Sequence, residues 1–497
     1  MLIKEILSSL DLGSSVAEHD QALEAYFVET GTFKGLVAGS YDAVAGDKGT
    51  GKTALYKILQ RRSPVLQDTE VLAGFNPVGV PVFQRLTEGE PLAEGQYTTI
   101  WKAYVLALVG NWILAVFNEA EYTSKMKQLD ELLRQGDLRS GDDSANTIFS
   151  RIANAVRRLG RIKNASASIT ITPEGWPILF PQVEFAEDDQ EGHIIRHDEA
   201  LRLLNDVLNE VEFTVWVVLD RLDEAFQGFP QAEVPALRAL LRTYLDLAEF
   251  DRVTLKLFVR KDLFRRIIAN GFVNLTHVND RKVEIVWDQE DLFDLLCRRL
   301  RENTKFVAAL GLGAEVDNET LFNAVFPTQV DQGLKKPTTW NWMLARIRDG
   351  NGIIAPRNLI DLAKKAQDAQ LRKEAREATE FDPTAGAGLI QSDAIKRGLA
   401  ALSSERVEDT LLAEAGEWAP AIEKFRDGRA EHNDWSLAST LSVPVGEVRM
   451  AIKPLLDIGF LEQTGETFKV PMLYRGGLSI TQGKAFASDD PGEDKEE

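Results

Sequence analysis

Residues 46–53 of the 497-residue chain read Gly46-Asp47-Lys48-Gly49-Thr50-Gly51-Lys52-Thr53, and Ala54 follows them. Their spacing is that of a phosphate-binding P-loop, G-x-x-x-x-G-K-[ST]. Glycines are required there because backbone N–H groups must approach polyphosphate oxygens more closely than a Cβ would allow. The stretch therefore predicts a nucleotide site in which residues 46–54 bind the phosphates.

The loop also supplies two side chains with defined chemistry. Lys52 can reach the β- and γ-phosphates, and the Thr53 hydroxyl can bind Mg²⁺. A short apolar run at 43–45 leads into the loop, and residues 54–59 continue as a good helix. The positive N-terminus of that helix would face the phosphates. This context is the strand, loop and helix that the motif needs.

A second motif follows an apolar run at residues 213–219. A continuous apolar run is typical of a central parallel strand that is buried on both faces. Asp220, Asp223 and Glu224 come where such a strand would emerge at the ligand-binding edge of the sheet. Asp220 is placed to hold Mg²⁺, and Asp223 or Glu224 can polarise an attacking water. The alternative is a strand that ends in a solvated acidic turn, and we would favour it if the P-loop were absent.

The two motifs, Gly46–Thr53 and Val217-Val218-Leu219-Asp220-Arg221-Leu222-Asp223-Glu224, resemble the Walker A and Walker B motifs of AAA+-related ATPases. The second is most similar to the STAND/NACHT branch and to related bacterial P-loop ATPases. The likeness extends over roughly residues 12–385, apart from an insertion. It implies an α/β P-loop NTPase core, a parallel sheet with helices on both faces, followed by a helical lid. It also implies ATP and Mg²⁺ as the bound groups.

The same resemblance implies roles for three arginines. Arg260 follows the apolar run 254–259 and matches the tip of the sensor 1 strand. Arg281 precedes the run 283–287, where AAA+ proteins place an arginine that points at the neighbouring subunit's nucleotide. Arg357 lies in a Pro-Arg element similar to sensor 2, which reaches back from the lid to the γ-phosphate. The alternatives are a surface arginine at a strand end, an arginine in a turn and a plain helix N-terminus.

The chain is too long for a single core, so several domains are expected. The patterns also predict an amphipathic helix at 20–27, a buried strand at 78–83, an apolar helix at 98–117 and a β-hairpin at 165–180. We expect these parts: an N-terminal helical arm at 1–35, the ATPase core at 36–290 with an insertion at about 120–200 of helices and the hairpin, the helical lid at 291–385, a winged-helix domain at 386–476 and an acidic tail at 477–497.

Two segments bear on nucleic-acid binding. Residues 434–475 read as a helix-turn-helix with a β-wing, but they hold four Lys or Arg against five Asp or Glu. A DNA-groove reader normally has a basic face. We therefore favour contact with protein over DNA for this domain. The segment Arg151–Lys163 is basic, and its apolar spacing favours the ordinary solvated face of an amphipathic helix.

The composition bears on the partners and the cellular compartment that we expect for the protein. The net charge of −20 argues against a general polyanion-binding surface and leaves room for a local basic patch. The one cysteine, Cys297, fits a reducing compartment. No secretory signal is visible, and the most apolar segment, 103–117, is shorter than the ~18 residues of a membrane span. We expect a cytoplasmic protein without membrane contact.

Together these features predict an ATP-driven switch of AAA+/STAND type that hydrolyses ATP slowly. The switch would assemble with itself or with an effector protein. The resemblance alone suggests bacterial antiviral defence. The alternatives are a DNA-binding ATPase of origin-recognition type that uses its winged helix, and a nucleotide-dependent scaffold without turnover.

Overall fold

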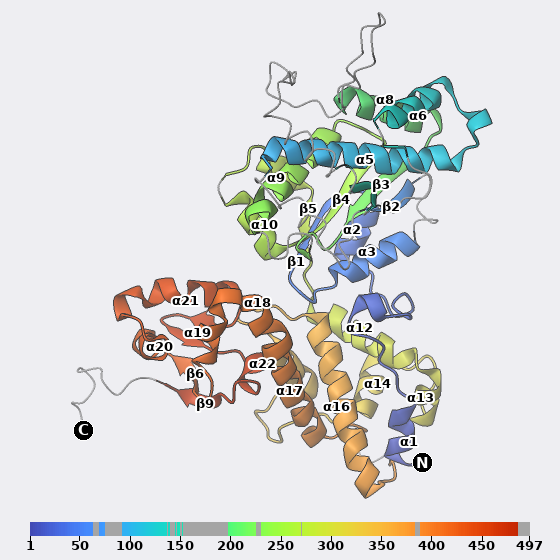
Figure 1. Ribbon diagram of the computed structural model, residues 1–497. Coiled ribbons are helices and arrows are strands. Elements are labelled where there is room, and N and C mark those ends of the chain that lie inside the picture. Colours follow the sequence, from blue (N-terminus) through green and yellow to red (C-terminus); the bar gives the residue numbers. More distant parts are fainter. Residues whose placement is uncertain are drawn as a thin grey trace, which may run out of the picture. The chain divides into compact units, whose positions relative to one another are not determined.

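The computed structural model describes residues 1–62, 69–74, 92–136, 138–139, 145, 147–149, 152, 197–224, 230–269, 271–382 and 388–485. These residues form two compact units (Figure 1). The first unit is Glu29–Val286, and the second combines Met1–Val28 with Trp287–Glu497. The strand predicted at 78–83, the hairpin at 165–180 and most of Arg151–Lys163 lie outside the described residues.

The first unit is built on a five-stranded sheet in the order β2-β3-β4-β1-β5, in which all neighbouring strands are parallel. The central strands β3 and β4 are buried along almost their whole length, as their apolar runs predict. The predicted parallel α/β core is confirmed. The strands are β1 Ala43–Gly46, β2 Thr69–Ala73, β3 Thr214–Leu219, β4 Val253–Arg260 and β5 Lys282–Glu284.

Helices cover both faces of this sheet, because successive strand side chains point to opposite faces. Val215 and Val217 belong to the core beneath α5 and α9. On the other face, Phe258 packs edge-on against Tyr56 of α3. The helices of this unit are α2 Gly31–Val37, α3 Lys52–Arg61, α5 Glu94–Val116, α6 Ser124–Gln135, α8 His197–Glu210, α9 Pro230–Leu247, α10 Lys261–Ile268 and α11 Leu275–Asp280.

Helix α5 is the long apolar helix that the sequence predicts. It crosses the strands in Figure 1, and its Trp101 indole donates a hydrogen bond of 2.9 Å to the Ala236 carbonyl of α9. Of the helices that the structure describes, α5 alone is long and apolar enough to cross a membrane. Its apolar window is 72% buried within the protein. The helix is therefore part of the core.

The first part of the second unit is helical and includes the N-terminal segment Met1–Val28. This part contains α1 Ile3–Ser8, α12 Gln289–Arg301, α13 Thr304–Ala309, α14 Asn318–Val325, α15 Thr339–Ile347 and α16 Pro356–Glu377. The helix predicted at 20–27 is wrong, because these residues form turns. The physical reason is tertiary: buried Asp20 pairs with Arg299 at 2.9 Å and also accepts a hydrogen bond from Tyr26.

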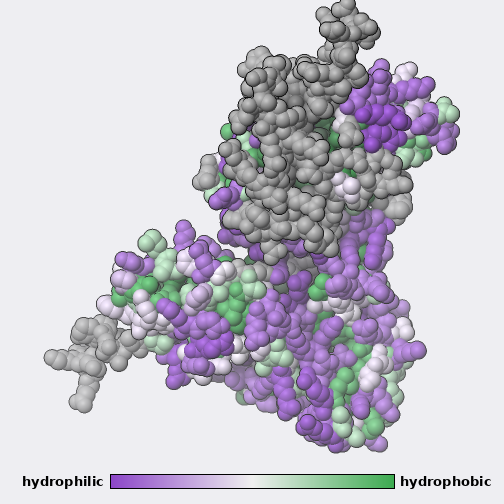
Figure 2. All heavy atoms as spheres, in the orientation of Figure 1, coloured by the Kyte–Doolittle hydropathy of each residue, from purple (hydrophilic) through white to green (hydrophobic). Residues whose placement is uncertain are grey.

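The last part of this unit is a winged helix, as the sequence predicts. Its sheet has the order β7-β8-β6-β9, and β9 lies within the range expected for the acidic tail. Figure 2 shows that the visible face of the second unit is mainly polar, with apolar residues in small scattered groups. The elements are α17 Ser392–Glu405, η6 Arg406–Leu412, α18 Ala413–Ala415, α19 Ala419–Glu423, β6 Arg429–His432, α20 Asp434–Leu441, α21 Val448–Asp457, β7 Glu462–Thr464, β8 Thr467–Lys469, α22 Met472–Arg475 and β9 Thr481–Lys484.

Candidate nucleotide-binding site

The glycines of the loop after β1 are in conformations that other residues avoid. Gly49 and Gly51 have φ of 78° and 102°, in the left-handed region that glycine adopts without steric cost. A Cβ on Gly46 would lie 2.6 Å from the Thr50 Oγ1 and 3.3 Å from the Lys52 Cγ. The loop is therefore closed tightly on itself, and its sequence leaves little freedom at these positions.

Lys52 is the first residue of α3, and Thr53 and Ala54 follow in the same turn. The Lys52 Nζ donates hydrogen bonds to the carbonyls of Gly46, at 2.8 Å, and Asp47, at 2.9 Å. Burial lowers the pKa of the ammonium, and the charges of Asp223 and Asp220 oppose this shift. The ammonium thus lies inside the loop with acidic groups close by.

Asp220 follows β3 and is only 4% exposed. The Thr53 side chain and the Arg221 backbone N–H donate hydrogen bonds to its carboxylate. Its Oδ2 is buried without a hydrogen-bond partner in the described part of the chain. Burial raises the pKa of Asp220 to about 6, against the effect of those donors and of Lys52. The two residues predicted to bind Mg²⁺ are therefore together, and one buried oxygen remains to be satisfied.

The register of the sheet places Arg260 beside the loop. Strand β4 lies between β1 and β3, with Arg260 opposite Gly46. The Arg260 guanidinium lies 3.5 Å from the Asp223 carboxylate and 3.0 Å from that of Asp262. Arg260 is thus at the strand tip that the sensor 1 likeness implies, and its role there stays a prediction.

Asp223 and Glu224 have different surroundings. Asp223 is engaged by Arg260, whereas Glu224 lies 3.6 Å from Arg221 and its side chain is 44% exposed. Burial raises the pKa of Glu224, and the charge of Arg221 opposes the shift. Of these two acidic residues, Asp223 pairs with Arg260 of β4, whereas Glu224 does not.

Arg281 lies directly before β5, at the end of the strands opposite to the glycine loop. Its guanidinium pairs with Asp42 and donates a 2.6 Å hydrogen bond to the Gly39 carbonyl. Asp42 is 4% exposed and also pairs with Lys256, at 2.7 Å. Burial alone would raise the pKa of Asp42, but the donors outweigh it and hold the pKa below its ordinary value. Arg281 thus has a role within the subunit that sequence reasoning missed.

Arg357 belongs to the second unit, where it is half-buried in the first turn of α16, next to Pro356. Proline is favoured at this position because the missing N–H would be unsatisfied there anyway. The predicted contact of Arg357 with the γ-phosphate stays a prediction.

The donor set fits a magnesium-bound nucleotide. Mg²⁺ prefers oxygen ligands and is usually held by one or two carboxylates, waters and substrate phosphates. Thr53 and Asp220 supply such oxygens next to the phosphate loop. Among the described residues, no group of three or more His, Cys, Asp or Glu side chains could hold a metal ion by itself. A Mg²⁺ ion held by Thr53 and Asp220 would take its further ligands from phosphates and water.

Comparisons with known proteins give distant likenesses. No protein-family model matches the sequence, and no curated protein sequence matches it. The ORC2 protein of Aeropyrum pernix, in ADPNP–ADP complexes, is 16% identical over 91% of this chain and 93% of that chain, with a TM-score of 0.37. Cdc6p from Pyrobaculum aerophilum is 12% identical over 90% and 92%, with a TM-score of 0.29. The ORC1 protein of A. pernix, in complex with DNA, is 14% identical over 92% and 91%, with a TM-score of 0.31.

The class of the protein follows from its own geometry. A parallel sheet, a glycine loop that leads into a helix, and a buried carboxylate at the end of a nearby strand define a P-loop NTPase fold. The second unit adds a helical part and a winged helix to this core.

The substitution Asp220→Asn should stabilise the nucleotide-free protein at pH 8 by up to about 3 kcal/mol. The folded state holds the Asp220 proton up to about pH 6, whereas the unfolded chain releases it near pH 4, so stability falls as pH rises between these values. The gain should therefore vanish toward pH 4. Urea unfolding at both pH values measures it. The exposed Asp251→Asn serves as control, with an expected change below ~0.5 kcal/mol. An equal gain at both pH values would contradict the assignment.

The substitution Arg281→Ala should destabilise the nucleotide-free protein by about 1–2 kcal/mol, because a buried carboxylate loses one of its two cationic partners. The loss is modest because 42% of the Arg281 side chain is exposed and Lys256 remains paired with Asp42. Denaturant unfolding measures the loss, and Arg265→Ala, an exposed arginine in the same unit, provides the control. Equal stability of the two variants would show that the Asp42 pair contributes nothing.

Proposed function

We propose that the protein binds ATP with Mg²⁺ and hydrolyses it slowly, as a switch whose assembly depends on the nucleotide. The observation that carries this proposal is the unsatisfied Oδ2 of Asp220, buried beside Thr53 and Lys52 at the mouth of the glycine loop. Burying an ionisable group with an unsatisfied oxygen is costly, and such groups cluster at functional sites. A magnesium ion on the phosphates would satisfy it.

The roles of the residues follow from their positions. The loop N–H groups and Lys52 would bind the phosphates, and Thr53 and Asp220 would hold the Mg²⁺, which neutralises charge on the transferred group. Glu224 would orient the attacking water, because Asp223 is held by Arg260. Arg260 would respond to the state of the phosphate through that same ion pair.

Two further arginines complete the proposed switch. Arg357 would reach the γ-phosphate from the lid, so that loss of the phosphate changes the position of the lid. Arg281 would face the nucleotide of a neighbouring subunit. The proposed partners are a second copy of the chain or an effector protein, in the cytoplasm. The role in antiviral defence rests only on the resemblance of the motifs.

The origin-recognition alternative gains little from the winged helix. On the predicted recognition helix α21, Arg449 pairs with Asp434 at 2.7 Å and lies over the Phe468 ring. Arg475 is only 6% exposed and donates to the Val470 carbonyl at 2.7 Å. Two of the four cations in residues 434–475 are therefore used within the fold rather than offered to a DNA groove.

Nucleotide-dependent assembly is tested by the particle mass of the full chain with and without ATP·Mg²⁺. We expect a larger particle with nucleotide for the wild type and no change for Lys52→Ala. Isothermal titration of the same proteins separates binding from assembly. Absence of ATP binding by the wild type would refute the proposal, and binding without any mass change would remove nucleotide-dependent assembly from it.

The substitution Glu224→Gln should lower ATP turnover by about 10²- to 10⁴-fold, because the water loses its general base, while ATP binding is retained. Phosphate release under assembly conditions measures turnover. Asp223→Asn is the matched comparison and should lower turnover less. If the wild type and Glu224→Gln both fail to turn over ATP while both assemble, the protein is a nucleotide-dependent scaffold.

A further inference from the structure

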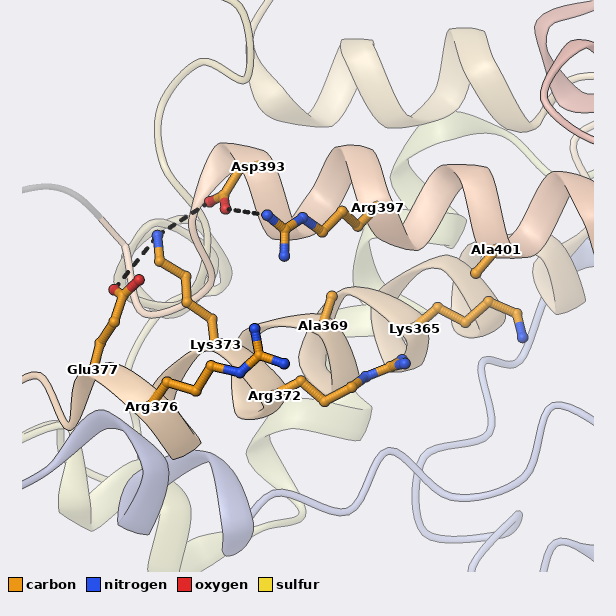
Figure 3. A pocket seen from close by; sticks show the side chains of 9 residues that line it. All are labelled: Lys365, Ala369, Arg372, Lys373, Arg376, Glu377, Asp393, Arg397 and Ala401. Atoms are coloured by element: carbon orange, nitrogen blue, oxygen red, sulfur yellow. Dashed lines mark ion pairs between the residues drawn. The ribbon is translucent and has the colours of Figure 1, made fainter. Parts of the chain in front are cut away.

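A groove of 470 Å³ lies beside helices α16 and α17 in the second unit (Figure 3). Most of its lining is charged, and the basic residues outnumber the acidic ones. The lining residues are Lys365, Ala369, Arg372, Lys373, Arg376, Glu377, Asp393, Arg397 and Ala401. In a chain with a net charge of −20, this is a local reversal of sign.

The two helices form a close-packed support for the groove. A Cβ added at Gly398 of α17 would lie 2.7 Å from the backbone N of Ala366 and 2.9 Å from its Cα. The helix backbones therefore approach each other more closely than a side chain would allow. Buried Ala363 and Ile395 also belong to the core of this unit. The charged side chains of the groove thus project from a closely packed pair of helices.

Two arginines of the groove, Arg372 and Arg376, take no part in its ion pairs. Lys373 lies 3.5 Å from Asp393 and 3.9 Å from Glu377, and Arg397 lies 3.8 Å from Asp393. Lys365 pairs with Glu405. The two that remain are on α16, and both are exposed.

Neither of these arginines has an acidic partner among the described residues. The Arg372 Nε donates to the Asp368 carbonyl of its own helix at 3.2 Å. The Arg376 guanidinium makes no hydrogen bond or ion pair with any residue that the structure describes. Guanidinium groups offer planar, paired donors that match phosphate oxygens. The groove therefore has unused donors of the kind that phosphates accept.

The spacing of the two unpaired arginines favours a ligand with more than one phosphate. Arg372 and Arg376 are four residues apart, so they share one face of α16. At a rise of 1.5 Å per residue they are separated by about 6 Å along the helix. A nucleic-acid strand presents a phosphate about every 3.4 Å of helix axis. A strand could therefore place two phosphates along this pair, and Lys365, which pairs with Glu405, lies seven residues before Arg372 on the same face.

We propose that the α16–α17 groove binds the sugar–phosphate backbone of a nucleic acid without reading its bases. No aromatic side chain lines the described groove on which a base could stack, and its two uncharged lining residues are Ala369 and Ala401. Base contacts specify sequence, whereas phosphate contacts do not. The proposal goes beyond ATP binding, because the groove contains none of the residues of the nucleotide site.

Fluorescence anisotropy of a labelled 20-nucleotide single strand and its duplex, titrated with the full chain, tests this proposal. Arg372→Glu/Arg376→Glu should weaken binding at least tenfold and lower the salt slope by about 1.4–1.8, as expected for two lost phosphate contacts. Lys335→Glu/Lys336→Glu changes the net charge equally at another exposed place in the same unit and should bind within twofold of the wild type. Arg372→Ala/Arg376→Ala and circular dichroism exclude misfolding as the cause. Lys52→Ala should bind nucleic acid normally, which separates this proposal from the ATP site.

Three results would overturn the proposal: no binding at 50 mM salt, equal loss in both double glutamate variants, or a preference for one base sequence. A fourth concerns the acidic segment 488–497 of the chain, which holds six acids and one lysine. If a peptide of that sequence binds the wild type and loses binding with Arg372→Glu/Arg376→Glu, while nucleic acid does not bind, the groove is a peptide site.

Discussion

The function proposed for the first unit depends on one buried carboxylate that its own chain does not fully satisfy. Asp220 leaves β3 into a space closed by the glycine loop, where Thr53 and a backbone N–H satisfy part of its hydrogen-bonding capacity. A polar group buried without its partners costs free energy. The chain tolerates this cost because the apolar contacts of β3 and β4 fix the end of the strand, whether or not Asp220 has all its hydrogen bonds. The site is therefore pre-formed by the core rather than by its own contacts.

A second buried aspartate of the first unit, Asp42, offers a comparison, because its carboxylate has charged and hydrogen-bonding partners within the fold. Asp42 lies before β1 at the opposite end of the strands and has Lys256, Arg281 and the Tyr244 hydroxyl as partners. Its pKa is held below the ordinary value, whereas that of Asp220 is raised to about 6. Both residues are 3–4% exposed, and the cationic partners of Asp42 lower its pKa against the effect of burial. Asp42 is thus satisfied within the fold, whereas Asp220 keeps one oxygen without a hydrogen-bond partner in the described part of the chain.

The sequence was informative where the signal is local. Continuous apolar runs predict β3 and β4, and the loop motif places Lys52 and Thr53, because neighbouring residues alone determine these features. The Asp42–Lys256–Arg281 cluster could not be predicted, because it joins three segments through the sheet register. A lysine inside the apolar run 254–259 was its one visible sign. The turns at 20–27 were missed for the same reason, since a distant arginine, Arg299, holds them in place of helix hydrogen bonds.

The charges of the second unit separate into those used by the fold and those offered to solvent. A count of charges from the sequence treats Arg449, Arg475 and Arg376 alike. In the structure, Arg449 pairs with Asp434, and buried Arg475 donates a hydrogen bond to the Val470 carbonyl. A count over the winged helix therefore overstates its capacity to attract phosphates. A count along the sequence does not detect the basic groove. Its cations alternate with acidic and apolar residues along α16, and they come together with the lining residues of α17 only in the folded chain. Positive surface on an acidic chain thus arises from helix geometry rather than from a basic stretch of sequence.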